Sequence, residues 1–204
     1  SLRVYRWFHE ATVSLYDPAL YDLYQRYLAL PEGEPAELID GEIILAPRPR
    51  VSHQTVVGGM AADLHTRFGG RHAKWKFLAG PELEFGQPGT PDLARMAPDV
   101  AGWLRAKLPD GDLPDTPAVT IVPDFVCEVL STNRKRDLEQ KLPRYARERI
   151  GHAWIIDPKT RELQVCRLKD GGYMFVARLA VEEDAAQRIE PFEEAEFVPS
   201  RWWE

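Results

Sequence analysis

The sequence predicts an α/β fold, because short apolar runs alternate with longer segments that have helical periodicity. The clearest strands are residues 100–104, 125–130 and 152–157, which are apolar runs bounded by polar residues, proline or glycine. A continuous apolar run of this length is typical of a strand that is buried on both faces of a sheet. Residues 17–30 and 52–68 carry apolar side chains three and four positions apart, which predicts two helices.

The composition fits one globular domain over residues 1–204, with 44% hydrophobic and 28% charged residues. The net charge of −6 argues against a protein that coats nucleic acid by bulk electrostatics, but it leaves room for a local basic face. No apolar run approaches the roughly 20 residues of a membrane span, and no signal peptide is visible. Cys127 and Cys166 lie in strand-like runs without metal-ligand spacing, so we expect buried thiols in a reducing cytoplasm.

The first helix and the hairpin that follows it are defined by local signals. Asp17-Pro18 is typical of a helix start, with the aspartate as cap and proline in the first turn. This helix is expected to bury an apolar stripe that consists of Leu20, Leu23, Tyr24, Tyr27 and Leu28. Residues 37–39 and 42–45 flank Asp40-Gly41, a preferred type I′ turn, and this pattern predicts the hairpin.

The second helix has Ser52 as its expected cap and a stripe of apolar residues four positions apart. The stripe consists of Val56, Met60, Leu64 and Phe68. Gly58-Gly59 weakens a helix by about 1 kcal/mol per glycine relative to alanine. A glycine pair at this place favours close packing of the helix against a sheet.

The elements after residue 70 are less regular. The sequence predicts a strand-like stretch at 74–85, a loop at 87–95, a surface excursion at 105–122, a helix at 137–149 and a final hairpin formed by 161–168 and 173–179. Pro143 requires a late start or a kink in that helix. The tail beyond residue 180, which contains Trp202-Trp203, carries no signal that we can interpret.

Glu128 interrupts the apolar run 125–130 and is therefore expected to be a buried carboxylate. Burying an ionised carboxylate costs several kcal/mol unless a cation, a metal ion or hydrogen bonds compensate it. Two interpretations stay open at this point. Glu128 belongs to an active site, or it forms a structural ion pair with an arginine.

Asp99 begins the strand that precedes the Glu128 strand, so the two carboxylates face one cleft if these strands pair. Two converging carboxylates suit a hard divalent ion, Mg²⁺ or Mn²⁺. Such an ion lowers the pKa of a bound water and neutralises charge on a phosphoryl oxygen. Lys141, near the start of the following helix, is placed to orient that water or to stabilise the developing charge.

Basic residues cluster directly after the Glu128 strand. The candidates for contacts with nucleic-acid phosphates are Arg134, Lys135, Arg136, Arg144 and Arg147. A solvated helix face is the alternative explanation for such a cluster. His53 is more typical of a structural hydrogen-bonding group, and Tyr145 of a residue that packs against the lysine or the core.

Several short motifs occur in a fixed order along the chain. They are Pro98-Asp99-Val100, Glu128-Val129-Leu130-Ser131, Arg136-Asp137, Lys141, Tyr145 and Trp154-Ile155-Ile156-Asp157, preceded by residues 37–42 and His53-Gln54. In this order they resemble the PD-(D/E)XK nuclease superfamily and, more closely, the bacterial Uma-two family. The resemblance covers roughly residues 18–180. It implies a restriction-endonuclease-like core with a central mixed β-sheet flanked by helices, to which this chain adds an N-terminal and a C-terminal hairpin.

The resemblance also implies divalent-metal-dependent cleavage of phosphodiesters. Asp99 and Glu128 match the two acidic residues that hold the metal ion. The superfamily often has lysine two residues after the second acid, where this chain has Leu130, and Lys141 matches a lysine moved to the following helix. Glu37 resembles an upstream acidic residue that orients a metal-bound water, with Glu42 as its rival.

We therefore expect an Mg²⁺- or Mn²⁺-dependent endonuclease that acts on DNA. The alternatives are a non-catalytic nucleic-acid-binding or assembly module that keeps the nuclease fold, and a metal hydrolase that acts on small phosphoesters. No membrane partner is expected. An exposed hairpin, the aromatic tail and the need to cut two strands of a duplex favour a homodimer.

Overall fold

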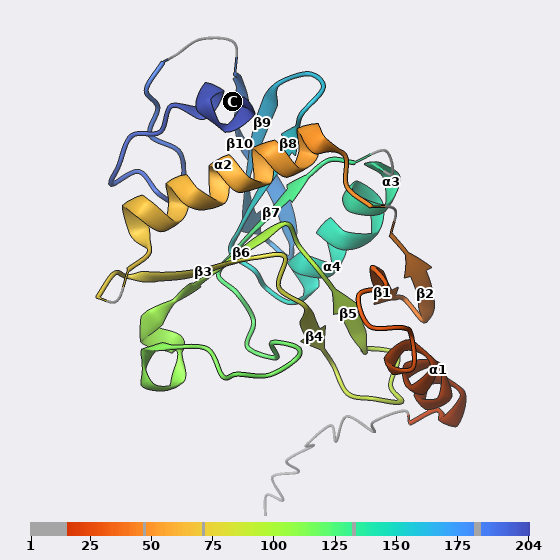
Figure 1. The fold of residues 1–204 in the computed structure, drawn as a ribbon. Helices are drawn as coiled ribbons and strands as arrows, with labels where there is room; N and C mark the ends of the chain where they lie inside the picture. Colours follow the sequence, from red (N-terminus) through yellow and green to blue (C-terminus); the bar gives the residue numbers. More distant parts are fainter. Residues whose placement is uncertain (1–15, 47, 71, 132–133, 182–184) are drawn as a thin grey trace, which may run out of the picture.

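The computed structural model describes residues 16–46, 48–70, 72–131, 134–181 and 185–204, and its centre is a six-stranded sheet (Figure 1). The strand order is β10-β9-β8-β7-β6-β3. The strands are β3 (Trp75–Ala79), β6 (Val100–Leu104), β7 (Phe125–Val129), β8 (His152–Asp157), β9 (Glu162–Lys169) and β10 (Gly172–Ala180). Only β7 and β8 pair in parallel within it, so the predicted mixed sheet is confirmed.

A smaller sheet of four strands lies beside the first, in the order β2-β1-β5-β4. Its strands are β1 (Ala36–Ile39), β2 (Glu42–Leu45), β4 (Leu83–Phe85) and β5 (Ala94–Met96). Asp40 and Gly41 have φ values of 48° and 78°, as the predicted turn between β1 and β2 requires. Two expectations for this region were wrong. Residues 94–96 form a strand where we expected a loop, and the stretch 74–85 divides into β3 and β4, which belong to different sheets.

Helix α1 (Pro18–Leu28) begins as predicted, since the Asp17 side chain accepts a hydrogen bond of 2.8 Å from the Ala19 amide. Its predicted apolar stripe is confirmed except at one position. Tyr24 is buried and Leu20, Leu23 and Tyr27 are half-buried, whereas Leu28 is 48% exposed. The helix packs on the small sheet through Tyr24, which clusters with Leu38 of β1 and with Leu93.

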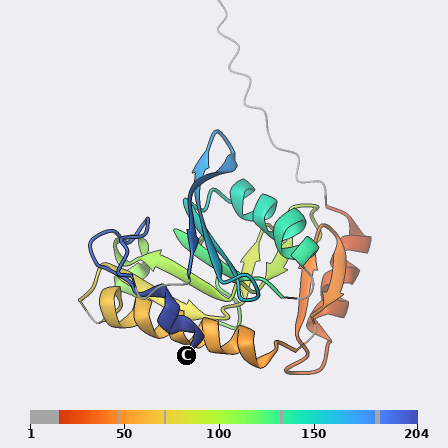
Figure 2. The same ribbon diagram turned by 90° about the horizontal axis from the view of Figure 1, so that it is seen from above.

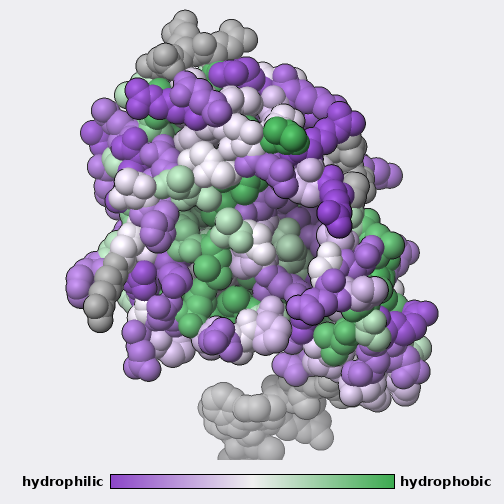
Figure 3. All heavy atoms as spheres, viewed as in Figure 1, coloured by the Kyte–Doolittle hydropathy of each residue, from purple (hydrophilic) through white to green (hydrophobic). Residues whose placement is uncertain are grey.

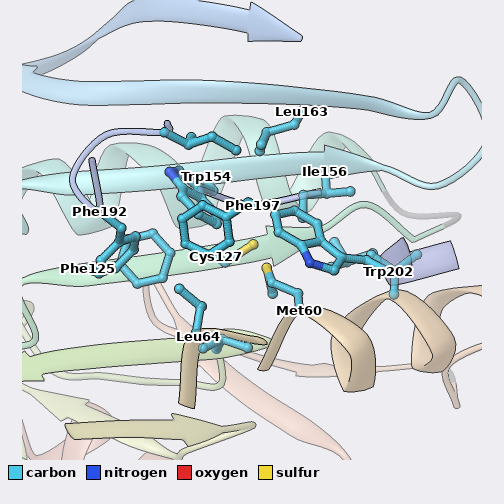
Figure 4. Packing of buried hydrophobic residues seen from close by; sticks show 14 of the residues in the cluster. Met60, Leu64, Phe125, Cys127, Trp154, Ile156, Leu163, Phe192, Phe197 and Trp202 are labelled. Atoms are coloured by element: carbon cyan, nitrogen blue, oxygen red, sulfur yellow. The ribbon is translucent and has the colours of Figure 1, made fainter. Parts of the chain in front are cut away.

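One face of the six-stranded sheet is covered by helix α2 (Val51–Phe68) and the C-terminal segment (Figures 1 and 2). The predicted stripe of Val56, Met60 and Leu64 is buried in this core. Figure 4 shows Met60 and Leu64 directed towards the side chains of β7 and β8. The expected Ser52 cap was wrong, because the helix begins one residue earlier and Arg50 precedes it without a side-chain capping bond.

The C-terminal segment completes the same core, which the sequence did not indicate. It contributes Ile189, Phe192, Phe197 and Trp202, all buried. Trp202 lies in the short helix η4 (Pro199–Trp203) and stacks on Trp154, with ring centroids 5.9 Å apart. A Cβ at Gly59 would lie 2.9 Å from the Trp202 Cα, so the predicted close packing at the glycine pair is made with η4 rather than with a sheet.

The opposite face of the large sheet carries the helical segment that connects β7 to β8 (Figure 2). It consists of α3 (Arg134–Arg136), the π-turn η3 (Asp137–Lys141) and α4 (Leu142–Arg147). The Leu142 amide donates to the Asp137 carbonyl, which is the i→i+5 bond of a π-helix. Pro143 is the second residue of α4, and the helical backbone runs through it without a break from Arg134, because the π-turn precedes it. The predicted late start is therefore wrong, since the helical segment begins before residue 137, and it ends at Arg147 rather than Arg149.

The remaining elements lie at the surface. The excursion over 105–122 contains the short helices η1 (Arg105–Lys107) and η2 (Pro109–Gly111). The hairpin of β9 and β10 projects from the edge of the large sheet (Figure 2), and it turns at Asp170 and Gly171, which both have positive φ. Across the residues that the structure describes, no helix has both the length and the apolar character needed to cross a membrane.

Candidate active site

A cavity of about 570 Å³ lies where β6 begins and β7 ends, between these strands, β1 and the π-turn η3. The four residues predicted to be catalytic all line it: Glu37, Asp99, Glu128 and Lys141. They come from four separate parts of the chain, so the fold brings together groups that the sequence spreads over 105 positions. The exposed rival of Glu37, Glu42, is not among the lining residues.

Asp99 and Glu128 meet because β6 and β7 pair in antiparallel register. Val100 lies opposite Cys127, and the same register places Asp99 opposite Glu128. Directly opposed residues project from the same face of a sheet. One oxygen of Asp99, Oδ2, accepts a hydrogen bond of 2.7 Å from the Val129 amide, which fixes this carboxylate against β7.

Glu128 is buried, with 3% of its surface exposed, and its charge is compensated by Lys141. The Nζ atom of Lys141 lies 2.7 Å from Oε1 and 2.8 Å from Oε2 of Glu128. The Tyr145 hydroxyl donates a further bond of 2.6 Å to Oε1. The structural interpretation of Glu128 assumed an ion pair with an arginine, whereas its partner in the structure is Lys141. Tyr145 orients the Glu128 carboxylate through its hydroxyl and also packs in the core.

Lys141 also connects Glu128 to Glu37. Its Nζ lies 3.1 Å from Oε1 of Glu37 and donates a bond of 2.9 Å to the Ala97 carbonyl. Glu37 Oε1 accepts a bond of 3.0 Å from the Ala97 amide. The other oxygen of Glu37, Oε2, is buried and has no hydrogen-bond partner among the described residues.

Carboxylates outnumber cations among the buried groups at the floor of the cavity, where Glu37, Glu128 and Asp137 surround Lys141 and Arg136. Burial first, and then the carboxylates of Asp99, Asp137 and Glu37, raise the pKa of Glu128 to about 8, although Lys141 opposes this shift. Burial also raises the pKa of Asp137. Burial alone would lower the pKa of Lys141, but the surrounding carboxylates outweigh it and raise the pKa above its ordinary value. Burial thus favours the protonated form of the two acids, and the neighbouring carboxylates favour the protonated form of the lysine.

The structure brings three further residues into contact with the predicted catalytic residues or their cavity: His53, Asp137 and Arg136, of which the sequence suggested only Arg136 for a site, as a phosphate contact. His53 lies with Nε2 3.1 Å from Oδ1 of Asp99, so it orients the second oxygen of that carboxylate. Asp137 is buried beside the cavity, and Arg136 has its Nε 3.4 Å from Oε2 of Glu37. The spacing from Asp137 to Lys141, one helical turn, was the available signal for Asp137. His53 was indicated only by its place in the motif order, because its partner Asp99 is 46 residues away.

The predicted phosphate contacts lie in different surroundings. Arg136 lines the cavity but is buried against Glu37, and Arg144 is buried with its guanidinium bonded to the Asp92 carbonyl and to Glu148. The other three are more exposed and form ion pairs, which are Arg134 with Asp157, Lys135 with Glu139 and Arg147 with Asp40. Each of these five cations already has a carboxylate partner.

The residues present fit a divalent cation. Four carboxylates line the cavity, of Glu37, Asp99, Glu128 and Asp137, and only two buried cations, Lys141 and Arg136, lie among them. Carboxylate oxygens are also the ligands that Mg²⁺ and Mn²⁺ prefer. Within the described ranges, no three His, Cys, Asp or Glu side chains converge closely enough to form a ready-made ion site. The protein therefore offers few ligand atoms for a metal ion. Few protein ligands are usual for Mg²⁺, which keeps several bound waters.

The mixed sheet with helices on both faces, acidic residues at its strand ends and a lysine from the adjoining helical segment define a restriction-endonuclease-like protein. The sequence model of the Uma2 family, described as "Putative restriction endonuclease", matches residues 22–196. The chain belongs to the Uma2 family, and the predicted family and fold class are confirmed.

A solved structure has the same fold, the crystal structure of a putative nuclease belonging to DUF820 from Anabaena variabilis. The TM-score is 0.69 at 20% sequence identity, and the match covers 88% of this chain and 96% of that one. No curated protein matches the chain. Family and fold support a nuclease, while the ion, the substrate and the roles of individual residues belong to the proposal that follows.

Proposed function

We propose that the protein is a divalent-metal-dependent endonuclease that hydrolyses phosphodiester bonds of DNA. The observation that carries the proposal is the cavity in which Lys141 bridges Glu37 and Glu128, with Asp99 on the adjacent strand. The family supports nuclease chemistry, and the carboxylates at the cavity floor support a divalent cation as their ligand.

In this proposal Asp99 and Glu128 hold Mg²⁺ or Mn²⁺ through their carboxylate oxygens. The bound ion supplies a water of lowered pKa and neutralises charge on the phosphate. The protein's own residues fix the geometry: the Val129 amide and His53 hold Asp99, and Lys141 and Tyr145 hold Glu128. Lys141 keeps its proton, so it presents a positive charge to a phosphoryl oxygen.

Plasmid nicking with added Mg²⁺ or Mn²⁺ tests the proposal. We expect the wild-type protein to nick the plasmid, EDTA to stop nicking, and Glu128→Gln to remove it. The matched control is Glu42→Gln, which changes an exposed glutamate outside the cavity. Unchanged nicking by Glu128→Gln would show that Glu128 has another role.

A non-catalytic nucleic-acid-binding module is the second candidate. It is favoured by the tight contacts of Lys141 with both glutamates, which hold these three side chains together without an ion. Calorimetric titration with Mn²⁺ separates the two functions. Binding that is lost in Glu128→Gln supports the nuclease, and absence of binding by the wild-type protein supports the module. A nucleotide monoester assayed in parallel with plasmid tests for a small-phosphoester hydrolase.

We also propose a homodimer, which the cutting of two strands would require. The edge strand β10 carries the exposed residues Met174 and Phe175, 40% and 64% exposed, and these offer an apolar contact for a second copy. Light scattering after size-exclusion chromatography measures the mass directly. A dimer that becomes a monomer in Phe175→Ser supports the proposal, and a monomeric wild-type protein at all concentrations rejects it.

A further inference from the structure

Three exposed cations surround the cavity without any carboxylate partner among the residues that the structure describes: Arg48, Arg50 and Lys159. They differ in this from the basic residues after β7, each of which is paired. An unpaired guanidinium keeps its donors for a ligand and can bind a phosphate through two parallel hydrogen bonds. The unpaired positive charges near the cavity therefore lie on the β2–α2 connection and the β8–β9 turn, and not on the helical segment after β7 that the sequence suggested.

Arg48 and Arg50 belong to the connection between β2 and α2, on either side of Pro49. Arg50 has φ −74° and ψ 160°, and proline before it also favours extended backbone. Residues two apart in extended backbone lie roughly 6–7 Å from each other. This separation is similar to that of successive phosphates along one nucleic-acid strand.

Lys159 is carried by the turn between β8 and β9, and this turn is fixed. The Lys159 amide donates a bond of 3.0 Å to Oδ1 of Asp157, and Arg134 binds Oδ2 of the same carboxylate. The sequence suggested Arg134 for phosphate contact. In the structure Arg134 pairs with Asp157 instead, and this ion pair holds the turn that presents Lys159.

We propose that Arg48, Arg50 and Lys159 grip the DNA phosphates that flank the scissile phosphate. The inference rests on the proposed function, because it assumes that a strand enters this cavity. The carboxylates of the cavity floor repel a phosphodiester, and three rim cations offset that repulsion at the entrance. In this proposal the three side chains contact the phosphates of DNA and not its bases, so they contribute affinity without sequence preference.

The test is the salt dependence of binding to a fluorescently labelled DNA oligonucleotide in Ca²⁺, measured by anisotropy on a duplex and on one of its strands. Each of Arg48→Ala, Arg50→Ala and Lys159→Ala is expected to reduce the slope of log K against log salt, by about 0.9 on duplex or 0.7 on single strand. The triple variant should lose about three times as much. The control is Lys169→Ala, which removes an exposed cation from the distant β9–β10 hairpin and should leave the slope unchanged.

The outcomes separate this inference from the proposed function. A triple variant with the wild-type slope overturns the phosphate grip, whether or not the protein nicks plasmid. A reduced slope in a protein that nicks no DNA with any ion supports the grip and rejects the nuclease. A wild-type protein that binds neither form of DNA overturns both. Circular dichroism of the variants should match the wild type, because all three side chains are exposed.

Discussion

Lys141 Nζ lies 2.7 Å from Oε1 of Glu128, although the two residues are 13 positions apart and belong to different elements. The lysine reaches Glu128 from the π-turn η3, and the strand position two residues after Glu128 is occupied by Leu130. Both Lys141 and Leu130 line the cavity. The Lys141 amine therefore reaches Glu128 from the helical segment that packs on the sheet, and not from strand β7 itself.

This arrangement predicts that the lysine can be moved. Lys141→Met should reduce nicking by about 10²–10³-fold, since it removes a preorganised positive charge. Adding Leu130→Lys to that variant should restore part of the loss, because residue 130 faces the same cavity. The control is Leu138→Lys in the same background, where the leucine is 36% exposed and does not line the cavity. Equal nicking by the two double variants would contradict the prediction. Initial rates of nicking provide the measurement.

The Tyr145 hydroxyl should tune the ion affinity of Glu128. Tyr145→Phe removes a bond of 2.6 Å to a buried carboxylate and should cost about 1.5–3 kcal/mol of stability. It should also weaken Mn²⁺ binding, because Glu128 loses one of the groups that orient it. Tyr173→Phe is the control, since that hydroxyl donates to the distant Ile150 carbonyl. Urea unfolding and Mn²⁺ calorimetry give the two readouts, and equal Mn²⁺ affinity in both variants would show that Tyr145 is purely structural.

The glycine pair of α2 offers a matched test of packing. Gly59→Ala places a Cβ 2.9 Å from the Trp202 backbone, so we expect a loss of about 1–3 kcal/mol. Gly58→Ala meets no atom within 4 Å and should instead stabilise the helix by about 0.5–1 kcal/mol. Thermal unfolding of the two variants measures the difference. A Gly59→Ala protein as stable as Gly58→Ala would mean that η4 does not pack there in solution.

Glu190 should account for part of the loss of stability in acid. Hydrogen bonds from Arg167, opposed by burial and helped by His152, lower the pKa of Glu190 below its ordinary 4.5. A lowered folded-state pKa stabilises the protein above pH 4.5, and this contribution is lost as pH falls through the folded value. The stability advantage of the wild type over Glu190→Gln should hence shrink as the pH falls below 4.5. Urea unfolding at several pH values checks it, and a difference that grows in acid would contradict it.

Local sequence signals predicted the elements whose causes are local. The Asp40-Gly41 turn requires positive φ at both positions, and the apolar run around Glu128 defines β7 wherever the rest of the chain lies. Strand β5 has only three residues, with Arg95 at its centre, and Arg95 is buried because Glu82 and Glu84 of a neighbouring segment pair with it. The residues next to Arg95 in the sequence do not indicate these ion pairs.

The candidate site shows the same division. Glu128 was recognisable because a carboxylate in an apolar run must have a partner, and the motif order indicated Asp99, Lys141 and Glu37. The roles of His53 and Tyr145 depend on contacts across 46 and 17 positions. The free cations of the rim could not be distinguished either, since pairing of a surface arginine is decided by the tertiary structure.

An amine carried by a turn of helix has a consequence for how related chains are recognised. Inserting or deleting one residue in that turn rotates the side chain without disturbing the ladder of the sheet, so the position of the amine along the sequence can vary while the acids stay in place. A search that demands a fixed interval between acid and lysine would pass over such chains. A search that asks which amine lies within reach of the acid in space would find them.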